Sequence, residues 1–320
     1  MECLEKEKVT EMKMNKIVKG FTAIALSSLL LAACGSDQKK DTAKSSDSST
    51  ATSKTADSSK ATEKEAGADL QDGTYKLEEK NESNGYRATF EMTVKDGKIT
   101  ESKYDNINAE GKSKADDKDY NKNMKAKSGV GPAEYIKELN DSFVKAQSAD
   151  GVEVVTGATH SSESFQNYAQ QLIQAAQAGD TKTIEIDNGA DLKDGTYSLK
   201  EKNNSNGYHT EFSIVVKGGK VTESNYDNVN DEGKSKKDDA DYNKNMKAKS
   251  GVGPAEYIKT LNEELVKTMN EEGKSAADVE VVTGATHSSH SFMMYAEQLI
   301  NAAEKGNTDE IVVDNIVMKK

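Results

Sequence analysis

Hydrophobic and polar residues alternate near residue 90, which is typical of a β-strand with one buried face. Phe90, Met92 and Val94 alternate with polar neighbours, and Asp96-Gly97 then turns the chain. Period-two burial followed by a two-residue turn that tolerates positive φ predicts a β-hairpin. The same pattern recurs later in the chain at Phe212, Ile214, Val216, Gly218 and Gly219.

Two later stretches carry hydrophobic residues at helical spacing. The first opens at Pro132, and its apolar stripe consists of Tyr135, Ile136, Leu139, Phe143 and Val144. The second ends at Gly179, and its stripe consists of Phe165, Tyr168, Ala169, Leu172, Ile173 and Ala176. Because proline suits a first helical turn and glycine suits a helix end, we expect two amphipathic helices. Residues 152–155, which lie between them, are expected to form a short strand.

Most of the chain is one unit written twice. The run 119–137 returns 122 residues later as 241–259. A period this long indicates tandem domains, because solenoid repeats run to about 20–50 residues. Strands and helices in this order predict an α+β fold built from an antiparallel hairpin sheet and helices, with one small core per copy. We place the copies at residues 69–187 and 188–320.

The N-terminus has the pattern of a targeting segment. Lys13, Lys16 and Lys19 precede an apolar run at residues 21–33 that is too short to span a membrane. The run ends in small residues directly before Cys34, which resembles the bacterial lipobox. We therefore expect a lipoprotein signal peptide at residues 1–33 and lipidation of Cys34. The alternative is an ordinary secretory signal with an incidental cysteine.

Composition then narrows the class of protein. Residues 34–68 are rich in Ser, Thr, Ala, Lys and Asp with little to bury, which predicts a disordered tether. The chain has 43 Lys and Arg against 55 Asp and Glu, a net charge of −12, and no basic stripe, which argues against nucleic-acid binding. Two cysteines exclude a disulfide framework. His287 and His290 are three residues apart, but Glu163 stands at the equivalent position of His290, so we expect no metal site.

A turn of small residues opens the second helix of each copy. It reads Thr156, Gly157, Ala158, Thr159 in the first copy and Thr283, Gly284, Ala285, Thr286 in the second. A helix N-terminus offers free N–H groups and the positive end of the helix dipole, so the turn can seat an anion beside the Thr159 hydroxyl. A phosphate could be hydrogen-bonded there or esterified. The alternative is a plain turn in which Ser161 or Ser162 caps the helix.

The turn resembles the flavinylation motif Asp-x-x-[Ser/Thr]-Gly-Ala-[Ser/Thr] of FMN-binding domains, which occur in the NqrC and RnfG subunits of bacterial redox pumps. In that family a flavin transferase of the ApbE type esterifies FMN, through its phosphate, to the last threonine. The resemblance implies two covalent FMN groups, on Thr159 and Thr286. Glu153 and Glu280 stand where the motif has Asp. Further candidate contacts to the flavin are Gly129, Gly131, Gly251, Gly253, His160, His287, Tyr120, Tyr135, Tyr242 and Tyr257.

A lipobox, a tether and two such domains resemble the flavoprotein lipoproteins of Gram-positive extracellular electron transfer. This implies an electron carrier, lipid-anchored to the cell membrane and facing the extracellular side. Its partners would be a membrane quinol-linked reductase and extracellular acceptors such as ferric iron or flavins; enzyme activity stays open. The alternatives are a solute-binding lipoprotein and a cell-surface adhesion module, both without a cofactor.

Overall fold

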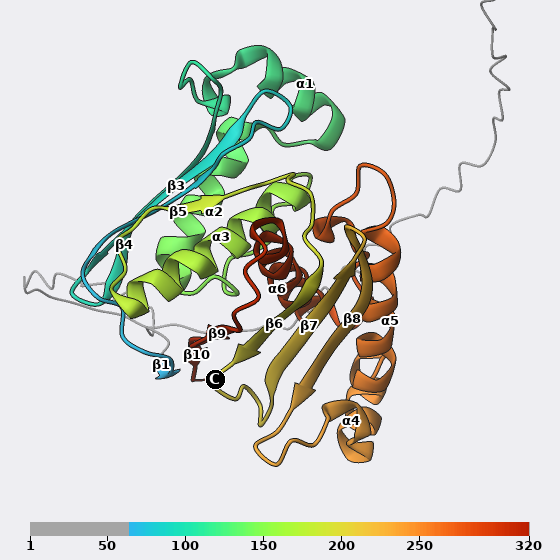
Figure 1. Cartoon of the computed structure of the whole chain (residues 1–320). Helices are drawn as coiled ribbons and strands as arrows, with labels where there is room; N and C mark the ends of the chain where they lie inside the picture. Colours follow the sequence, from blue (N-terminus) through green and yellow to red (C-terminus); the bar gives the residue numbers. More distant parts are fainter. Residues whose placement is uncertain (1–63, 320) are drawn as a thin grey trace, which may run out of the picture. The chain divides into compact units, whose positions relative to one another are not determined.

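The structure is a computed structural model that describes residues 64–319 (Figure 1). The expected signal peptide, the Cys34 lipidation site and most of the expected tether lie outside the described residues. Within residues 64–319 no helix is both long and apolar enough to cross a membrane.

The first copy forms a four-stranded mixed sheet covered by helices. Its strands have the order β4-β3-β2-β5, with β2 and β5 parallel and the other pairs antiparallel. The strands are β2 (Gly73–Glu79), β3 (Arg87–Lys95), β4 (Lys98–Ile107) and β5 (Ile184–Ile186). The helices are the 3-10 turn η1 (Lys114–Asp116), α1 (Lys118–Ser128), α2 (Pro132–Ala146) and α3 (Thr159–Ala178).

The second copy repeats this architecture with the strand order β8-β7-β6-β9. Its strands are β6 (Gly195–Glu201), β7 (His209–Lys217), β8 (Lys220–Val229) and β9 (Ile311–Val313). Its helices are η2 (Lys236–Asp238), α4 (Ala240–Ser250), α5 (Pro254–Thr268), η3 (Ala276–Asp278) and α6 (Thr286–Lys305). A separate two-stranded sheet pairs β1 (Lys64–Ala66) with β10 (Val317–Met318), which lie side by side in Figure 1.

The predicted hairpin and both predicted helices are confirmed. Strands β3 and β4 meet at a turn in which Asp96 and Gly97 have φ values of 53° and 69°. A turn with two positive φ values matches the right-handed twist of the strands it joins. The alternating side chains of β3 point into the core, where Met92 is completely buried. Gly179 ends α3 in the left-handed conformation that favours glycine at this position.

Residues 152–155 do not form the expected strand. Side chains of α3 take the place of a neighbouring strand as their hydrogen-bond partners. The Val155 N–H donates to Ser162 Oγ at 3.0 Å, and the Val152 carbonyl accepts from Gln166 Nε2 at 2.6 Å. The segment is therefore an extended strap fastened to the helix that follows it.

Three further features differ from expectation. The sheets are mixed, because β5 and β9 each add a short parallel edge strand to the antiparallel hairpin. Part of the expected tether is ordered, since Lys64–Ala66 forms β1. The two copies also share one continuous hydrophobic cluster in place of two separate cores.

The two copies meet where α3 packs against α6. Polar side chains cross this interface: the Asn167 amide donates to Asn301 Oδ1 at 3.1 Å, and the Gln174 amide donates to Gln298 Oε1 at 3.4 Å. Both helices also carry the residues that follow the Thr-Gly-Ala-Thr turns. Each Thr-Gly-Ala-Thr turn is thus connected to the other copy through a single helix.

Candidate functional site

The Thr-Gly-Ala-Thr turn leads directly into a long helix. Helix α3 begins at Thr159, and the capping residue Ala158 makes no side-chain cap hydrogen bond. Thr156 and Thr159 are exposed, whereas Ala158 is buried. The second copy has the same arrangement at Thr283, Ala285 and Thr286. Each copy therefore presents an exposed threonine hydroxyl at the positive end of a helix twenty residues long.

The alternative of a serine N-cap is wrong. Ser162 lies one turn inside the helix and is completely buried. Its hydroxyl accepts the N–H of Val155 and donates to the carbonyl of Ala158 at 2.9 Å. Ser162 therefore joins Val155, before the turn, to Ala158 at its end, and no side chain caps the helix N-terminus.

Gly157 holds this turn against the end of α1. It has a φ of +85°, and a Cβ at this position would lie 2.1 Å from the Ser128 carbonyl oxygen. Gly284 in the second copy has the same φ, and its Cβ would lie 2.2 Å from the Ser250 carbonyl oxygen. Only glycine allows this approach without moving a backbone. The glycine of the motif is thus explained by packing.

The other glycines of the candidate site form the loop on which the turn rests. Gly129 ends α1 with a φ of +85° and no neighbour within 4 Å of its would-be Cβ. A Cβ at Gly131 would lie 2.8 Å from the side-chain oxygen of Asn121. Gly251 and Gly253 repeat these roles. The structure brings this glycine loop to the Thr-Gly-Ala-Thr turn, and whether the loop touches a flavin ring stays a prediction.

A cavity of about 450 Å³ lies beside the first turns of α6. We name it the second-domain cavity. Its lining includes His287, Ser288, Ser291, Tyr295, Tyr208 and Lys236. A volume of several hundred Å³ is typical of small-molecule sites. Because His287 and Ser288 directly follow Thr286, a phosphate ester on Thr286 would leave its ring system next to this cavity.

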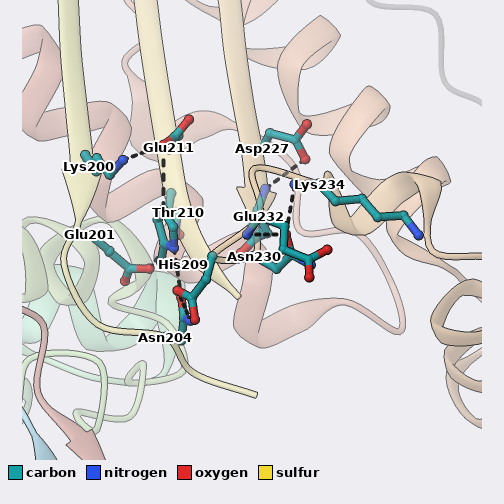
Figure 2. Close-up of polar contacts among 12 residues, drawn as sticks. Lys200, Glu201, Asn204, His209, Thr210, Glu211, Asp227, Asn230, Glu232 and Lys234 are labelled. Carbon is teal, nitrogen blue, oxygen red and sulfur yellow. Dashed lines mark hydrogen bonds and ion pairs between the residues drawn. The ribbon is translucent and has the colours of Figure 1, made fainter. Parts of the chain in front are cut away.

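A glutamate holds the wall of the second-domain cavity together. Glu201 Oε1 accepts from the Tyr295 hydroxyl at 2.6 Å, and its Oε2 accepts from the Thr210 N–H at 2.7 Å. Both carboxylate oxygens of Glu201 therefore accept a hydrogen bond. Figure 2 shows Glu201 at this strand end, with His209 beside it. The His209 Nδ1 lies 2.8 Å from Asn204 Oδ1.

The first copy repeats the tyrosine–glutamate pair. The Tyr168 hydroxyl donates to Glu79 Oε1 at 2.5 Å, and the Ala88 N–H donates to Glu79 Oε2 at 2.7 Å. Arg87 replaces His209, and it donates to Glu78 Oε2 at 3.1 Å. The tyrosine–glutamate hydrogen bonds of the two sites are therefore the same, while the residue beside them is Arg87 in one copy and His209 in the other.

The tyrosines of the sites are neutral hydrogen-bond donors at physiological pH. Burial raises the pKa of Tyr168 and Tyr295 well above the usual range, and the nearby Glu79 and Glu201 carboxylates act in the same direction. The hydrogen bond to Asp239 raises the pKa of Tyr208 to about 12. Hydroxyls of this kind can donate to an acceptor without carrying charge themselves.

The stacking candidates divide into two classes. Tyr135 and Tyr257 are each only 1% exposed and belong to the core, where burial raises their pKa to about 12. Tyr120 stands edge-on to Tyr86, with ring centroids 5.7 Å apart. Helix burial therefore explains the first class, and the second class already has aromatic partners.

Two of the histidines, His160 and His290, lie close to residues of the other copy. His160 is exposed, and its Nε2 is 3.4 Å from Asp278 Oδ1 of the second copy. His290 Nδ1 is 3.7 Å from Glu163 Oε1 of the first copy. Over residues 64–319, His, Asp and Glu form no group of three or more that could hold a metal ion.

Sequence reasoning missed the part of each site that comes from the other copy. Ser148, Asp150, Gln170 and Ile173 of the first copy line the second-domain cavity, as do Asn315 to Lys319 at the end of the chain. Glu79 and Glu201 were also missed. Their recurrence at the 122-residue offset was a signal, but most other residues recur at the same offset and diluted it.

Known proteins share this domain. Residues 85–174 match the FMN-binding domain family. The chain is 36% identical over 116 residues to the 15 kDa lipoprotein of Treponema pallidum (strain Nichols), covering 36% of this chain and 82% of that protein. It is 42% identical to the CPE2226 protein of Clostridium perfringens, whose crystal structure aligns with a TM-score of 0.36 over 37% of this chain and 98% of that chain.

The exposed threonine, the glycine-dependent turn and the adjoining cavity suit a phosphate-bearing ring compound such as FMN. The aligned stretch of the Treponema relative is about as long as one copy of the repeat. The relative is 36% identical and is covered over 82% of its length, and residues 85–174 match the family model. The chain therefore belongs to the FMN-binding domain family.

Proposed function

We propose that the protein is a membrane-anchored electron carrier with FMN esterified to Thr159 and to Thr286. The observation that carries this proposal is the exposed threonine at the start of α3 and of α6, each behind a turn that only glycine allows. FMN supplies the chemistry of accepting and releasing one or two electrons. The chain supplies attachment, orientation and the charges around the ring.

The helix N-terminus and the tyrosine–glutamate pair have separate tasks in this proposal. The first N–H groups of α3 and α6 lack intrahelical partners and would be available to hold the ester phosphate. Glu201 fixes the Tyr295 hydroxyl, and Glu79 fixes that of Tyr168. These pairs hold the inner end of each site rigid, and their neutral tyrosines add no charge beside the ring.

The N-terminal pattern and the lipoprotein relative support the cellular setting that we propose. Lipidation at Cys34 would anchor the chain to the extracellular side of the cell membrane of a Gram-positive bacterium. An ApbE-type transferase would attach the flavins. A membrane quinol-linked reductase would supply electrons, and ferric iron or flavins outside the cell would accept them.

Intact mass tests the attachment. The chain from residue 36 onward is produced with an active ApbE-type transferase, as wild type and as Thr159→Ala, Thr286→Ala and the double variant. We expect a gain of two FMN less two waters, falling to one and then to none. Thr156→Ala and Thr283→Ala are matched controls, because these threonines are exposed in the same turns and should keep both flavins.

An unmodified wild type, with the transferase shown to act on another substrate, would overturn the proposal. That result would favour a solute-binding or adhesion lipoprotein, in which the turn is purely structural. Loss of flavin in Thr156→Ala but not in Thr159→Ala would move the attachment site within the turn.

A further inference from the structure

Charged side chains are buried where α3 crosses α6. Glu163 on α3 is only 1% exposed, and the nearest cation-forming group is His290 on α6, 3.7 Å away. Glu163 and His290 occupy equivalent positions of the two copies, so the duplicated site faces its own counterpart. A charge buried this deeply is costly unless it is paired or neutralised by a proton.

A second carboxylate shares this location. Glu297 is partly buried on α6, and the charge of Glu163 acts on it directly. The groups that face Glu297 are Glu163 of α3, Glu79 of β2 and Glu304 of its own helix, and the Asn167 amide of α3 donates a hydrogen bond to it. The carboxylates that act on Glu297 therefore come from three elements, α3, β2 and α6.

Several polar atoms at this interface have no hydrogen-bond partner. Among the described residues they include both carboxylate oxygens of Glu163, Oε2 of Glu297 and Nδ1 of His290. These three buried carboxylate oxygens are acceptors that lack a donor, and a bound proton would supply one. A proton bound to Glu297 would remove the like-charge repulsion between Glu297 and Glu163.

We infer that the Glu297 carboxyl, located between α3 and α6, is a proton-binding site that responds to the charge of the flavin site in the first copy. Glu297 lines a cavity of about 420 Å³ together with Tyr168, the partner of Glu79. Tyr168 is the equivalent of Tyr295 in the second-domain cavity. A residue of the second copy thus borders the cavity that contains Tyr168 of the first.

The electrostatics support this assignment. Burial and the Glu163 charge raise the pKa of Glu297 to about 8, against the opposing effect of the Asn167 hydrogen bond. Glu297 is then protonated at neutral pH. The equivalent residue of the first copy is Gln170, a neutral side chain of the same shape. One copy therefore has a fixed neutral group where the other has a titratable one.

The consequence rests on the proposed function. An electron that reaches the first site without a proton leaves a negative charge there, which strengthens proton binding at Glu297. Near pH 8, where part of the Glu297 population is ionised, solvent supplies that proton and the carboxylate becomes a neutral acid, so no other reactant is needed. By reciprocity, a protonated Glu297 raises the reduction potential of the first site, and deprotonation above about pH 8 lowers it.

Infrared spectroscopy of the flavin-free full chain tests the proton directly. At pH 7 wild type should show the carbonyl stretch of a protonated carboxylic acid that is lost in Glu297→Gln and retained in Glu138→Gln, an exposed control. Raising the pH through 8 should remove this band from wild type. If wild type and Glu297→Gln give the same carboxylic-acid spectrum at pH 7, the inference is wrong.

Redox titration tests the linkage in the Thr286→Ala background, where the first site alone is loaded. With Glu297 in place, the reduction potential of the first site should fall in a step near pH 8, and Glu297→Gln should not show this step. Glu163→Gln should move the step to lower pH, and it serves as a second variant should Glu297→Gln fail to fold. Identical pH profiles of the potential with Glu297 and with Glu297→Gln would overturn the linkage. A chain that accepts no flavin would overturn only the proposed function, because the infrared experiment needs no flavin.

Discussion

The backbone of Gly157 lies directly against the carbonyl group of Ser128, so close that a Cβ at residue 157 would be 2.1 Å from the oxygen. This contact joins the Thr-Gly-Ala-Thr turn to the end of α1. It also places the exposed Thr159 hydroxyl over a support that is itself a helix terminus. The position of the hydroxyl therefore depends on a residue two places away that has no side chain.

Gly157→Ala should displace the turn. Alanine at a φ of +85° costs about 1–2 kcal/mol, and the clash with Ser128 adds to this cost. We expect a loss of stability above about 2 kcal/mol in urea unfolding, and slower FMN loading at Thr159. Gly129→Ala is a matched control, because it has the same φ and no neighbour within 4 Å. Equal losses in both variants would show that the contact with Ser128 is unimportant.

Ser162→Ala should loosen the strap that precedes the turn. The substitution leaves the Val155 N–H without its 3.0 Å partner in a buried location, which costs about 1–3 kcal/mol. Thermal unfolding of Ser162→Ala beside Ser164→Ala, a half-exposed serine of the same helix, measures the effect. The expectation fails if the two variants melt together.

Asn315→Ala should destabilise the second copy. The substitution removes two hydrogen bonds of the Asn315 side chain: its Oδ1 accepts from the Asn203 N–H, and its amide donates to the Asn203 carbonyl, both at 2.9 Å. Asn315 is buried, so we expect a loss of about 1–3 kcal/mol in urea unfolding. Asn188→Ala removes the equivalent bonds to Asn81 from a half-exposed residue and should cost less. A larger loss for Asn188→Ala would contradict this ordering.

The stability of the chain should fall as pH rises toward 8. The pKa of Glu297 is about 8 in the folded chain against an ordinary value of 4.5, so the folded state holds a proton that the unfolded state has lost. This contribution is complete below pH 4.5 and is lost through pH 8, at up to about 1.4 kcal/mol per pH unit. Glu297→Gln should be more stable than wild type at pH 8, by about 4 kcal/mol, and equally stable at pH 4.5. Parallel stability curves for the two proteins would contradict the assignment.

Hydrophobic periodicity was sufficient to locate the elements that bury one face. The hairpin at Asp96-Gly97 and helices α2 and α3 all have such a face, and all were predicted. Helix α1 has no buried residue at all, so it has no periodicity to detect. Its stability comes from its ends, where Asp117 accepts the Tyr120 N–H at 2.8 Å and Gly129 closes the last turn.

The sequence predicted the part of the site that is formed by consecutive residues, and it did not predict the contacts between distant segments. The Thr-Gly-Ala-Thr turn is continuous, and its exposed threonines follow from its place before a helix. The strand at residues 152–155 was wrong because valines favour strands, while Ser162 and Gln166 supplied the hydrogen bonds instead. The meeting of Glu163 with His290 was beyond prediction, because a single sequence does not state which helix faces pack together.

The pairing of β1 with β10 determines how the folded part would carry mechanical load. A pull on the chain from before residue 64 reaches β1 first, and the hydrogen bonds between β1 and β10 pass it to the end of the second copy. Asp314 adds a second point of attachment, because its side chain accepts the Ala68 N–H at 3.2 Å and its carbonyl accepts from Gln177 of α3 at 2.7 Å. Tension along an anchoring segment would therefore be shared between both domains, and it would not peel the first domain away from the second.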